Sequence, residues 1–497
     1  MKENTASGNF NQAIWLTASS FSSFALALVS AAILSRYFDK AEYGTYKQIL
    51  YVYTTLQTVF TAGLPGVFAY FIPRLTQGQG KKLINSVNRL FVLLGLIFSL
   101  FLYLSSDLIA GLLKNPELST GLKIFSPFPL FVIPALGVEG IYTALRKTKL
   151  IAIYQVTTKI LMLLCIILPV IVLKGTYRSA IIGWGVASFL TFIIAMIMKK
   201  RPYFRIKEEL IPGMYKTVFN YSLPLMGASL GGMILQSADQ FFISRFSGKV
   251  VFAEFSNGSI QISFIGMIAG SVSSVLLPVF SKAESEGKLN MTFGTYERAT
   301  LKTINLIYPL IFFCIFFAKD LVILMYGEQY EVSKSYLRVS LLRGIIQVFY
   351  YLPILLALGK SNVYFWVHLI FALSIWLVDF VIVMLLLPPI SIAISSALVQ
   401  VLISLVILGY LNSKHNIVLI PINILKYMVV IMLHLSIGAA IVLLVRNILL
   451  KSFGPFIVLS VTLPLFYLLI ISTGKFLRID YATELIVRIK EFTKLEK

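Results

Sequence analysis

The chain has 497 residues, of which 58% are hydrophobic and only 13% are charged. A soluble domain carries about 25% charged and about 45–50% apolar residues, so this chain has too little polar surface to cover a water-soluble protein of its size. The composition therefore excludes a water-soluble globular protein and predicts a polytopic membrane protein.

The 43 Lys and Arg residues outnumber the 21 Asp and Glu residues. In a membrane protein, much of such an excess marks cytoplasmic loops, so it does not indicate a nucleic-acid partner. Cys165 and Cys314 each lie inside an apolar run, and the three His residues are scattered. We therefore expect no disulfide, no metal site and no cofactor, and the sequence leaves coupling to H⁺ or Na⁺ open.

Apolar segments of the length that a bilayer requires, about 17–25 residues, recur from end to end. They predict fourteen membrane-spanning helices near residues 12–34, 48–72, 87–112, 121–145, 150–173, 179–198, 217–244, 251–280, 301–325, 335–358, 363–387, 390–411, 422–446 and 455–473. If the N-terminus is cytoplasmic, the basic clusters within residues 74–89, 146–149 and 199–207 all lie inside. The positive-inside rule thus favours cytoplasmic N- and C-termini.

An internal repeat relates the two halves of the chain. Without gaps, the run Ser35-Arg36-Tyr37 aligns with Ser244-Arg245-Phe246, and the same shift aligns Lys40 with Lys249. Each copy lies between the first and second helix of a set of six, so the repeat predicts two parallel six-helix lobes, an arrangement typical of transporters.

The predicted fold is an all-α integral membrane protein with two further helices after the lobes. We expect an N-terminal lobe in residues 1–200, a cytoplasmic linker in 201–216, a C-terminal lobe in 217–412 and the last two helices in 413–474. Residues 475–497 form either a basic amphipathic cytoplasmic helix or a solvated tail.

The first two helices of each lobe are unusually polar. Because amides and hydroxyls facing lipid are costly, these faces point either at each other, as packing contacts, or into a water-lined cleft between the lobes. The polar candidates for such a cleft, with one acid from the fourth helix, are Gln57, Gln236, Asp239, Gln240, Asn257, Gln261 and Glu139.

Ionisable residues inside membrane spans are functional candidates. Arg36 and Arg245 end equivalent helices and would either hold a phosphate together or bind helix ends and snorkel. Lys159 would either attract an anionic head group or pair with Glu139. Asp239 would form an ion pair, bind a coupling cation or be protonated in one state. The candidates for binding an anionic substrate are Arg36, Lys47, Lys159, Arg245 and Arg343.

Prolines and glycines mark two helices where bending is expected. Gly63, Pro65 and Gly66 interrupt the second helix, and Pro224 interrupts the seventh. These positions are either hinges for alternating access or static kinks. Enzyme signatures are missing from the sequence, since it has no Asp-x-Asp, no Walker loop and no His-Glu-x-x-His. We therefore expect no catalytic residues.

Three motifs carry a resemblance to a known family: LSRYFDKAEYGTY at residues 34–46, SLPL with ADQ at 222–240 followed by FAEFS at 252–256, and LVILMYGEQY at 321–330. With these motifs and fourteen helices, the chain resembles the Wzx-type oligosaccharide flippases. These are the polysaccharide-exporter branch of the MOP superfamily, which also contains the MATE transporters and the lipid II flippase.

The resemblance implies export of lipopolysaccharide or capsule units. The substrate would be an undecaprenyl-pyrophosphate-linked oligosaccharide, moved by alternating access from the inner to the outer leaflet of a bacterial inner membrane. The partners would be this lipid, the phospholipid bilayer, and a polysaccharide polymerase with its chain-length regulator. The alternatives are a lipid II or MATE-type transporter and, from a different class, a membrane polysaccharide polymerase or glycosyltransferase.

Overall fold

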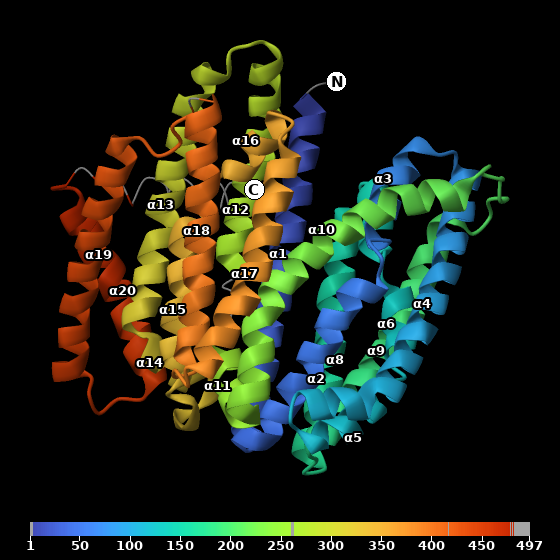
Figure 1. Ribbon diagram of the computed structural model, residues 1–497, viewed down its shortest axis with the longest axis horizontal. Coiled ribbons are helices and arrows are strands. Elements are labelled where there is room, and N and C mark those ends of the chain that lie inside the picture. Colours follow the sequence, from blue (N-terminus) through green and yellow to red (C-terminus); the bar gives the residue numbers. More distant parts are fainter. Residues whose placement is uncertain (1–2, 260–262, 416, 478, 480, 482–497) are drawn as a thin grey trace. The chain divides into compact units, whose positions relative to one another are not determined.

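The computed structural model describes residues 3–259, 263–415, 417–477, 479 and 481, and each secondary-structure element in these ranges is a helix (Figure 1). The chain forms two compact units, Met1–Ala253 and Glu254–Lys497. The expected cytoplasmic tail lies outside the described residues from residue 482 onward. Gln261, one of the polar candidates, also lies outside them.

The first unit begins with long helices separated by short, broken ones. Its helices are α1 (Glu3–Tyr37), α2 (Lys40–Phe60), α3 (Pro65–Phe71), α4 (Gln77–Leu112), α5 (Pro116–Phe125), α6 (Pro129–Ala135), α7 (Val138–Ala144), α8 (Thr148–Val172), α9 (Tyr177–Lys200) and α10 (Met214–Phe242). A π-helical turn, η3 (Ile243–Ser247), then leads into α11 (Gly248–Gly258), which continues into the second unit.

The second unit continues the helical pattern. Its helices are α12 (Ser263–Ser285), α13 (Phe293–Phe316), α14 (Ala318–Tyr326), α15 (Ser333–Ile346), α16 (Tyr351–Ala357), α17 (Ser361–Met384), α18 (Ile390–His415), α19 (Ile422–Leu449) and α20 (Pro455–Gly474). Here α17 packs on α18 and α19 on α20 (Figure 1).

Within the described residues, ten helices are long and apolar enough to cross a membrane, and counting three bent pairs as single spans raises the number to thirteen. Each of the thirteen corresponds to one expected span. The fourteenth expected span, 251–280, contains residues 260–262, which are not described, and its described part lies in α11 and α12. The number fourteen therefore stays a prediction.

Three of the expected spans are broken, and the sequence predicts an interruption only in the first of them. The segments 48–72, 121–145 and 335–358 bend by 42°, 55° and 41° between consecutive helices. In the first of these, Gly63 adopts a φ of +68° and Pro65 opens α3. A proline has no N–H to donate and is tolerated at a helix start, so the chain ends one helix there and begins another.

Helix α4 shows that the outer surface of the first unit is apolar. Four leucines spaced four residues apart are each at least 55% exposed: Leu96, Leu100, Leu104 and Leu108. Residues four apart lie on one face of a helix, and the opposite face of α4 is buried against α5 and α6. An exposed leucine stripe of this length fits contact with lipid.

An aromatic cluster joins four helices of the first unit. The ring of Tyr53 on α2 lies 4.9 Å from Phe125 on α5 and 5.2 Å from Trp184 on α9, and Phe98 on α4 stacks on it at 5.9 Å. Aromatic pairs at these separations contribute about 0.5–1.5 kcal/mol each beyond the area they bury. The cluster therefore fixes α2 against the rest of the unit.

Candidate functional site

A cavity of about 230 Å³ in the first unit brings together two of the expected basic residues. Lys47 from α2 and Lys159 from α8 both line it, with apolar side chains from α1 and the rings of Tyr43 and Trp184. None of the residues that line the cavity is acidic. The Lys47 ammonium lies 5.2 Å above the Tyr43 ring, a cation–π contact that favours its charged form.

Beside this cavity, two consecutive hydrogen bonds engage Glu139, the acid that we expected near Lys159. The hydroxyl of Ser19 donates to Gln155 Oε1 at 2.6 Å, and the amide of Gln155 donates to Glu139 Oε1 at 2.8 Å. No ion pair joins Lys159 to Glu139 in the part of the chain that the structure describes. Glu139 still lies close enough to act on Lys159 electrostatically, so both expected roles of Lys159 stay predictions.

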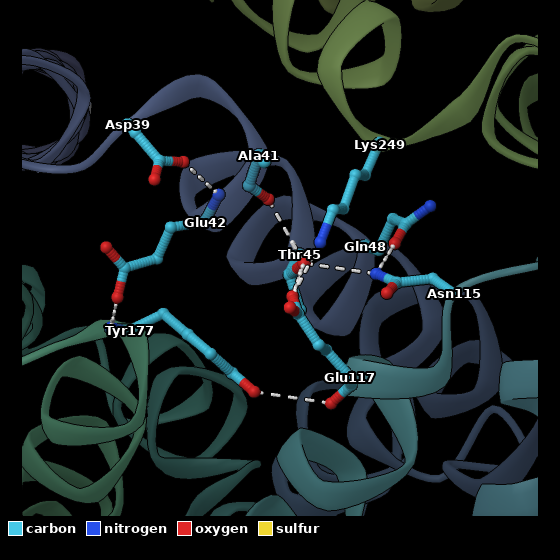
Figure 2. Close-up of polar contacts among 9 residues, drawn as sticks. All are labelled: Asp39, Ala41, Glu42, Thr45, Gln48, Asn115, Glu117, Tyr177 and Lys249. Carbon is cyan, nitrogen blue, oxygen red and sulfur yellow. Dashed lines mark hydrogen bonds and ion pairs between the residues drawn. The ribbon is translucent and has the colours of Figure 1, made fainter.

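A polar cluster at one end of the first unit, which we call the Gln48 cluster, consists of Thr45, Gln48, Asn115, Glu117 and Lys249 (Figure 2). Asn115 precedes α5, and its amide donates to Gln48 Oε1 at 2.6 Å and to Thr45 Oγ1 at 3.1 Å. Thr45 and Gln48 are fully buried. Buried amides and hydroxyls are costly without partners, so these bonds hold α5 firmly against α2.

Charged groups extend the cluster toward α9 and α11 (Figure 2). The Lys249 ammonium lies 2.7 Å from Glu117 Oε2, which also accepts from Thr45 at 3.3 Å. The backbone N–H of Tyr177, at the start of α9, donates to Glu42 Oε1 at 2.7 Å. Residues from the first, third, fifth and seventh connections thus meet at one end of the unit, as alternating up and down helices require.

The two copies of the sequence repeat contact each other through this cluster. The amide of Gln48 donates to the hydroxyl of Ser244 at 2.7 Å, a bond between buried groups. Gly44 packs directly on the backbone of Lys249. The aligned pair Lys40 and Lys249 occupies corresponding places, because α2 begins at Lys40 and α11 begins one residue before Lys249.

The two expected arginines have different surroundings. Arg36 lies exposed in the last turn of α1. Arg245 is half-buried in η3, where its guanidinium donates to the carbonyl of Leu112 at the end of α4 and lies 5.3 Å from the Phe246 ring. Arg245 therefore binds the C-terminal end of another helix, α4.

The expected hinge residues meet in the structure. A β-carbon on Gly63 would come within 2.4 Å of the Ser222 carbonyl oxygen, and one on Gly66 within 2.9 Å of a Leu225 methyl group. These contacts bracket Pro224 inside α10. The break between α2 and α3 thus packs on the proline turn of α10, where small residues allow the two backbones to approach closely.

The other polar candidates do not line the Lys47 cavity. Gln57 on α2 and Gln240 on α10 are half-buried, Asp239 is buried, and Gln236 is exposed. Asn257 is buried on α11, and Arg343 is half-buried on α15 in the second unit.

Sequence reasoning missed Gln48, Asn115 and Glu117. An amide at the very start of an apolar run was the only available signal for Gln48. Asn115 and Glu117 lie in a short connection that looks like any polar loop.

Comparisons with known proteins identify a family and a fold for this chain. The model of a family described as "polysaccharide biosynthesis protein" matches residues 10–284. Among curated proteins no significant match is found.

Solved structures match over most of the chain. The lipid II flippase MurJ in an inward closed conformation has a TM-score of 0.70 and 18% identity, over 93% of this chain and 99% of MurJ. A MOP superfamily transporter from Pyrococcus furiosus, described as having a binding pocket of reverse polarity, has a TM-score of 0.59 and 13% identity, over 81% and 94%. A Vibrio cholerae MATE transporter in the bent form has a TM-score of 0.54 and 17% identity, over 82% and 95%. At these identities the likeness shows the fold.

Proposed function

The chain belongs to the polysaccharide biosynthesis protein family and has the fold of MOP superfamily transporters, and we propose that it is a flippase for an undecaprenyl-pyrophosphate-linked oligosaccharide. It would move this lipid from the inner to the outer leaflet of a bacterial inner membrane by alternating access. The observation that carries the proposal is the cavity that Lys47 and Lys159 line together.

The chemistry of this cavity suits the phosphate end of such a lipid. Two ammonium groups with no acid among the lining residues favour an anion, and an isolated anion inside a membrane costs several kcal/mol without such groups. At about 230 Å³ the cavity has room for a phosphate-sized group and none for an oligosaccharide. The sugar would therefore lie outside this cavity while Lys47 and Lys159 bind the pyrophosphate.

Alternating access requires contacts that close one end and can separate. The Gln48 cluster supplies such contacts, because it joins α2 to residues 244–249 through hydrogen bonds and one ion pair. Polar contacts of this kind contribute only about 0.5–1.5 kcal/mol each, since water replaces them when they open. We propose that they separate when the outer end opens, and that bending occurs at Gly63 and Pro224.

The proposed topology places the Gln48 cluster outside and both chain termini in the cytoplasm. The cluster contains residues from odd-numbered connections, whereas the basic stretches at 74–89, 146–149 and 199–207 belong to even-numbered ones. The positive-inside rule assigns the second group to the cytoplasm.

A deletion strain tests the proposal against the different-class alternative, a membrane polymerase or glycosyltransferase. Loss of a flippase leaves carrier-linked repeat units on the cytoplasmic face, where an added periplasmic glycosidase cannot reach them. Loss of a polymerase leaves single units on the outer face, where the glycosidase digests them. Digestible units in the deletion strain would overturn the proposal.

The likeness to MurJ over 93% of this chain makes lipid II the second candidate substrate. Proteoliposomes that contain the purified chain separate the two. Fluorescent undecaprenyl-pyrophosphate oligosaccharide and fluorescent lipid II are offered in parallel, and a quencher added outside reports which lipid changes leaflet. If only lipid II changes leaflet, then lipid II is the substrate and the lipid-linked oligosaccharide is not.

A further inference from the structure

A second pocket in the first unit lies where α4 begins and α9 ends, and it is rich in lysine. Its volume is about 280 Å³, and its polar lining consists of Lys81, Asn85, Lys199, Lys200 and Tyr203, with two apolar residues completing the wall. None of the lining residues is acidic. The pocket shares no lining residue with the cavity of Lys47 and Lys159.

The most unusual residue of this pocket is Lys199, which is fully buried. Its ammonium donates to the Pro134 carbonyl at 2.7 Å and to Asn88 Oδ1 at 2.9 Å. The rings of Phe68 and Phe91 lie 5.6 Å and 5.2 Å from it. Carbonyl oxygens and aromatic faces favour a cation, yet no carboxylate forms an ion pair with Lys199 among the described residues. Buried charges normally have an oppositely charged partner.

Two acids that follow α9, Glu208 and Glu209, are bound by other groups. Glu208 accepts from the Asn85 amide at 2.6 Å and lies 3.3 Å from the Lys82 ammonium. The Asn85 hydrogen bond, followed by Lys82, holds the pKa of Glu208 below its usual range, so its carboxylate is ionised. Glu209 accepts from the Thr76 hydroxyl. Glu208 therefore offsets part of the charge at the rim and leaves the interior of the pocket cationic.

From this arrangement we propose that the pocket binds the phosphate of a membrane lipid. Lys81 and Lys200 would contact the phosphate oxygens directly, with Lys199 in the wall of the pocket. The pocket opens at the end of a membrane span, next to Phe204, whose side chain is 79% exposed. Tyrosine, here Tyr203 in the pocket wall, is enriched at membrane–water interfaces, and basic pockets between helices at the membrane surface suit anionic head groups.

The phosphate has two sources, a phospholipid head group or a polyprenyl carrier, and the test distinguishes them. The purified full-length chain is placed in nanodiscs of phosphatidylcholine alone, or with phosphatidylglycerol, undecaprenyl phosphate or inorganic phosphate added. Retained lipid is measured by native mass spectrometry, and the thermal midpoint is measured in parallel. The test variant is Lys81→Gln with Lys200→Gln, which leaves buried Lys199 in place. The control is Lys414→Gln with Lys451→Gln, two exposed lysines elsewhere.

We expect the wild type and the control to retain the phosphorylated lipid and to gain thermal stability from it. The test variant should bind this lipid about 25-fold more weakly, since each lysine near an anionic lipid contributes roughly a fivefold factor. A preference for phosphatidylglycerol or for undecaprenyl phosphate identifies the source. Equal binding by the test variant and the control would overturn the proposal, and so would stabilisation by inorganic phosphate without either lipid. The proposal does not depend on transport, so its failure would leave the flippase function untouched.

Discussion

Gly44 lies so close to the backbone of Lys249 that a β-carbon at position 44 would come within 2.0 Å of the Lys249 carbonyl oxygen. Real β-carbons do not approach a carbonyl oxygen this closely, so only glycine permits the contact. Gln48 and Ser244 form a buried hydrogen bond one helical turn further along α2. The contact between α2 and residues 244–249 therefore depends on the absence of a side chain at Gly44.

Gly44→Ala should prevent α2 from closing on residues 244–249. We expect transport to fall at least tenfold, because the added methyl group pushes against backbone and not against a movable side chain. Gly111→Ala on α4 is the matched control, since a β-carbon there meets nothing within 4 Å.

Cysteine labelling shows whether Gly44→Ala opens the closed end. The reporter is Thr45→Cys, introduced after Cys165 and Cys314 have been replaced by Ala. Thr45 is fully buried in the structure. The reporter should react with a membrane-impermeant maleimide faster in the Gly44→Ala background than in the Gly111→Ala background. Equal labelling would show that the contact does not close this end.

Removing the positive charges of the Lys47 cavity should impair substrate binding. We expect Lys47→Gln and Lys159→Gln each to lower the apparent substrate affinity about tenfold or more, because a hydrogen bond to a charged group contributes about 1.5–3 kcal/mol. Lys47→Arg should retain most of the activity. The measurement is the substrate dependence of flipping in proteoliposomes, with the exposed Lys451→Gln as control. Unchanged affinity in both variants would remove the cavity from the mechanism.

The two arginines of the repeat can be tested together and separately. Arg36→Ala with Arg245→Ala should abolish surface polysaccharide while the protein remains folded and inserted. Because Arg245 binds the Leu112 carbonyl, Arg245→Ala alone should also loosen the end of α4, seen as faster amide exchange near residue 112. Arg36→Ala alone should leave that exchange unchanged. Normal polymer output from the double variant would exclude both arginines from the transport mechanism.

Gly63 should not tolerate a side chain. Alanine at a φ of +68° costs roughly 1–2 kcal/mol, and its β-carbon would also press on the Ser222 carbonyl. We expect Gly63→Ala to slow transport more than it lowers expression. Gly231→Ala, where a β-carbon meets nothing within 4 Å, should have little effect on flipping rates. Similar flipping rates for Gly63→Ala and Gly231→Ala would show that the break at Gly63 is a static kink and not a hinge.

One ion pair in the second unit should contribute to stability. Arg446 on α19 lies 2.7 Å from Asp320 on α14, which is 4% exposed. Arg446→Met leaves a buried carboxylate without this partner, and we expect unfolding to become easier by about 3 kcal/mol. Thermal unfolding in detergent measures the loss. Lys123→Met, which breaks the exposed pair with Asp107, should change stability by less than about 1 kcal/mol.

Several features could be predicted from the sequence because they depend on residues that are close in the chain. Thirteen of the apolar runs correspond to helices or bent helix pairs that are long enough to cross a membrane, and Gly63 with Pro65 predicted a helix break. The repeat aligned Lys40 with Lys249 in loops between helices, and in the structure α2 begins at Lys40 and α11 begins one residue before Lys249. The motifs at residues 34–46 and 222–256 indicated the family, and its model matches over that region.

Other features needed the fold. Whether Lys159 faces Glu139, lipid or Lys47 depends on how α8 is rotated about its own axis, and hydropathy is nearly the same for every rotation of so apolar a helix. The contacts of Gly44 with Lys249 and of Lys199 with Pro134 join residues that are far apart in the chain. By itself, the sequence determined that the chain has apolar segments long enough to span a membrane and that the second of them breaks near Gly63. Only the tertiary structure decided which charges share a cavity, because that depends on side-chain directions set by packing between helices.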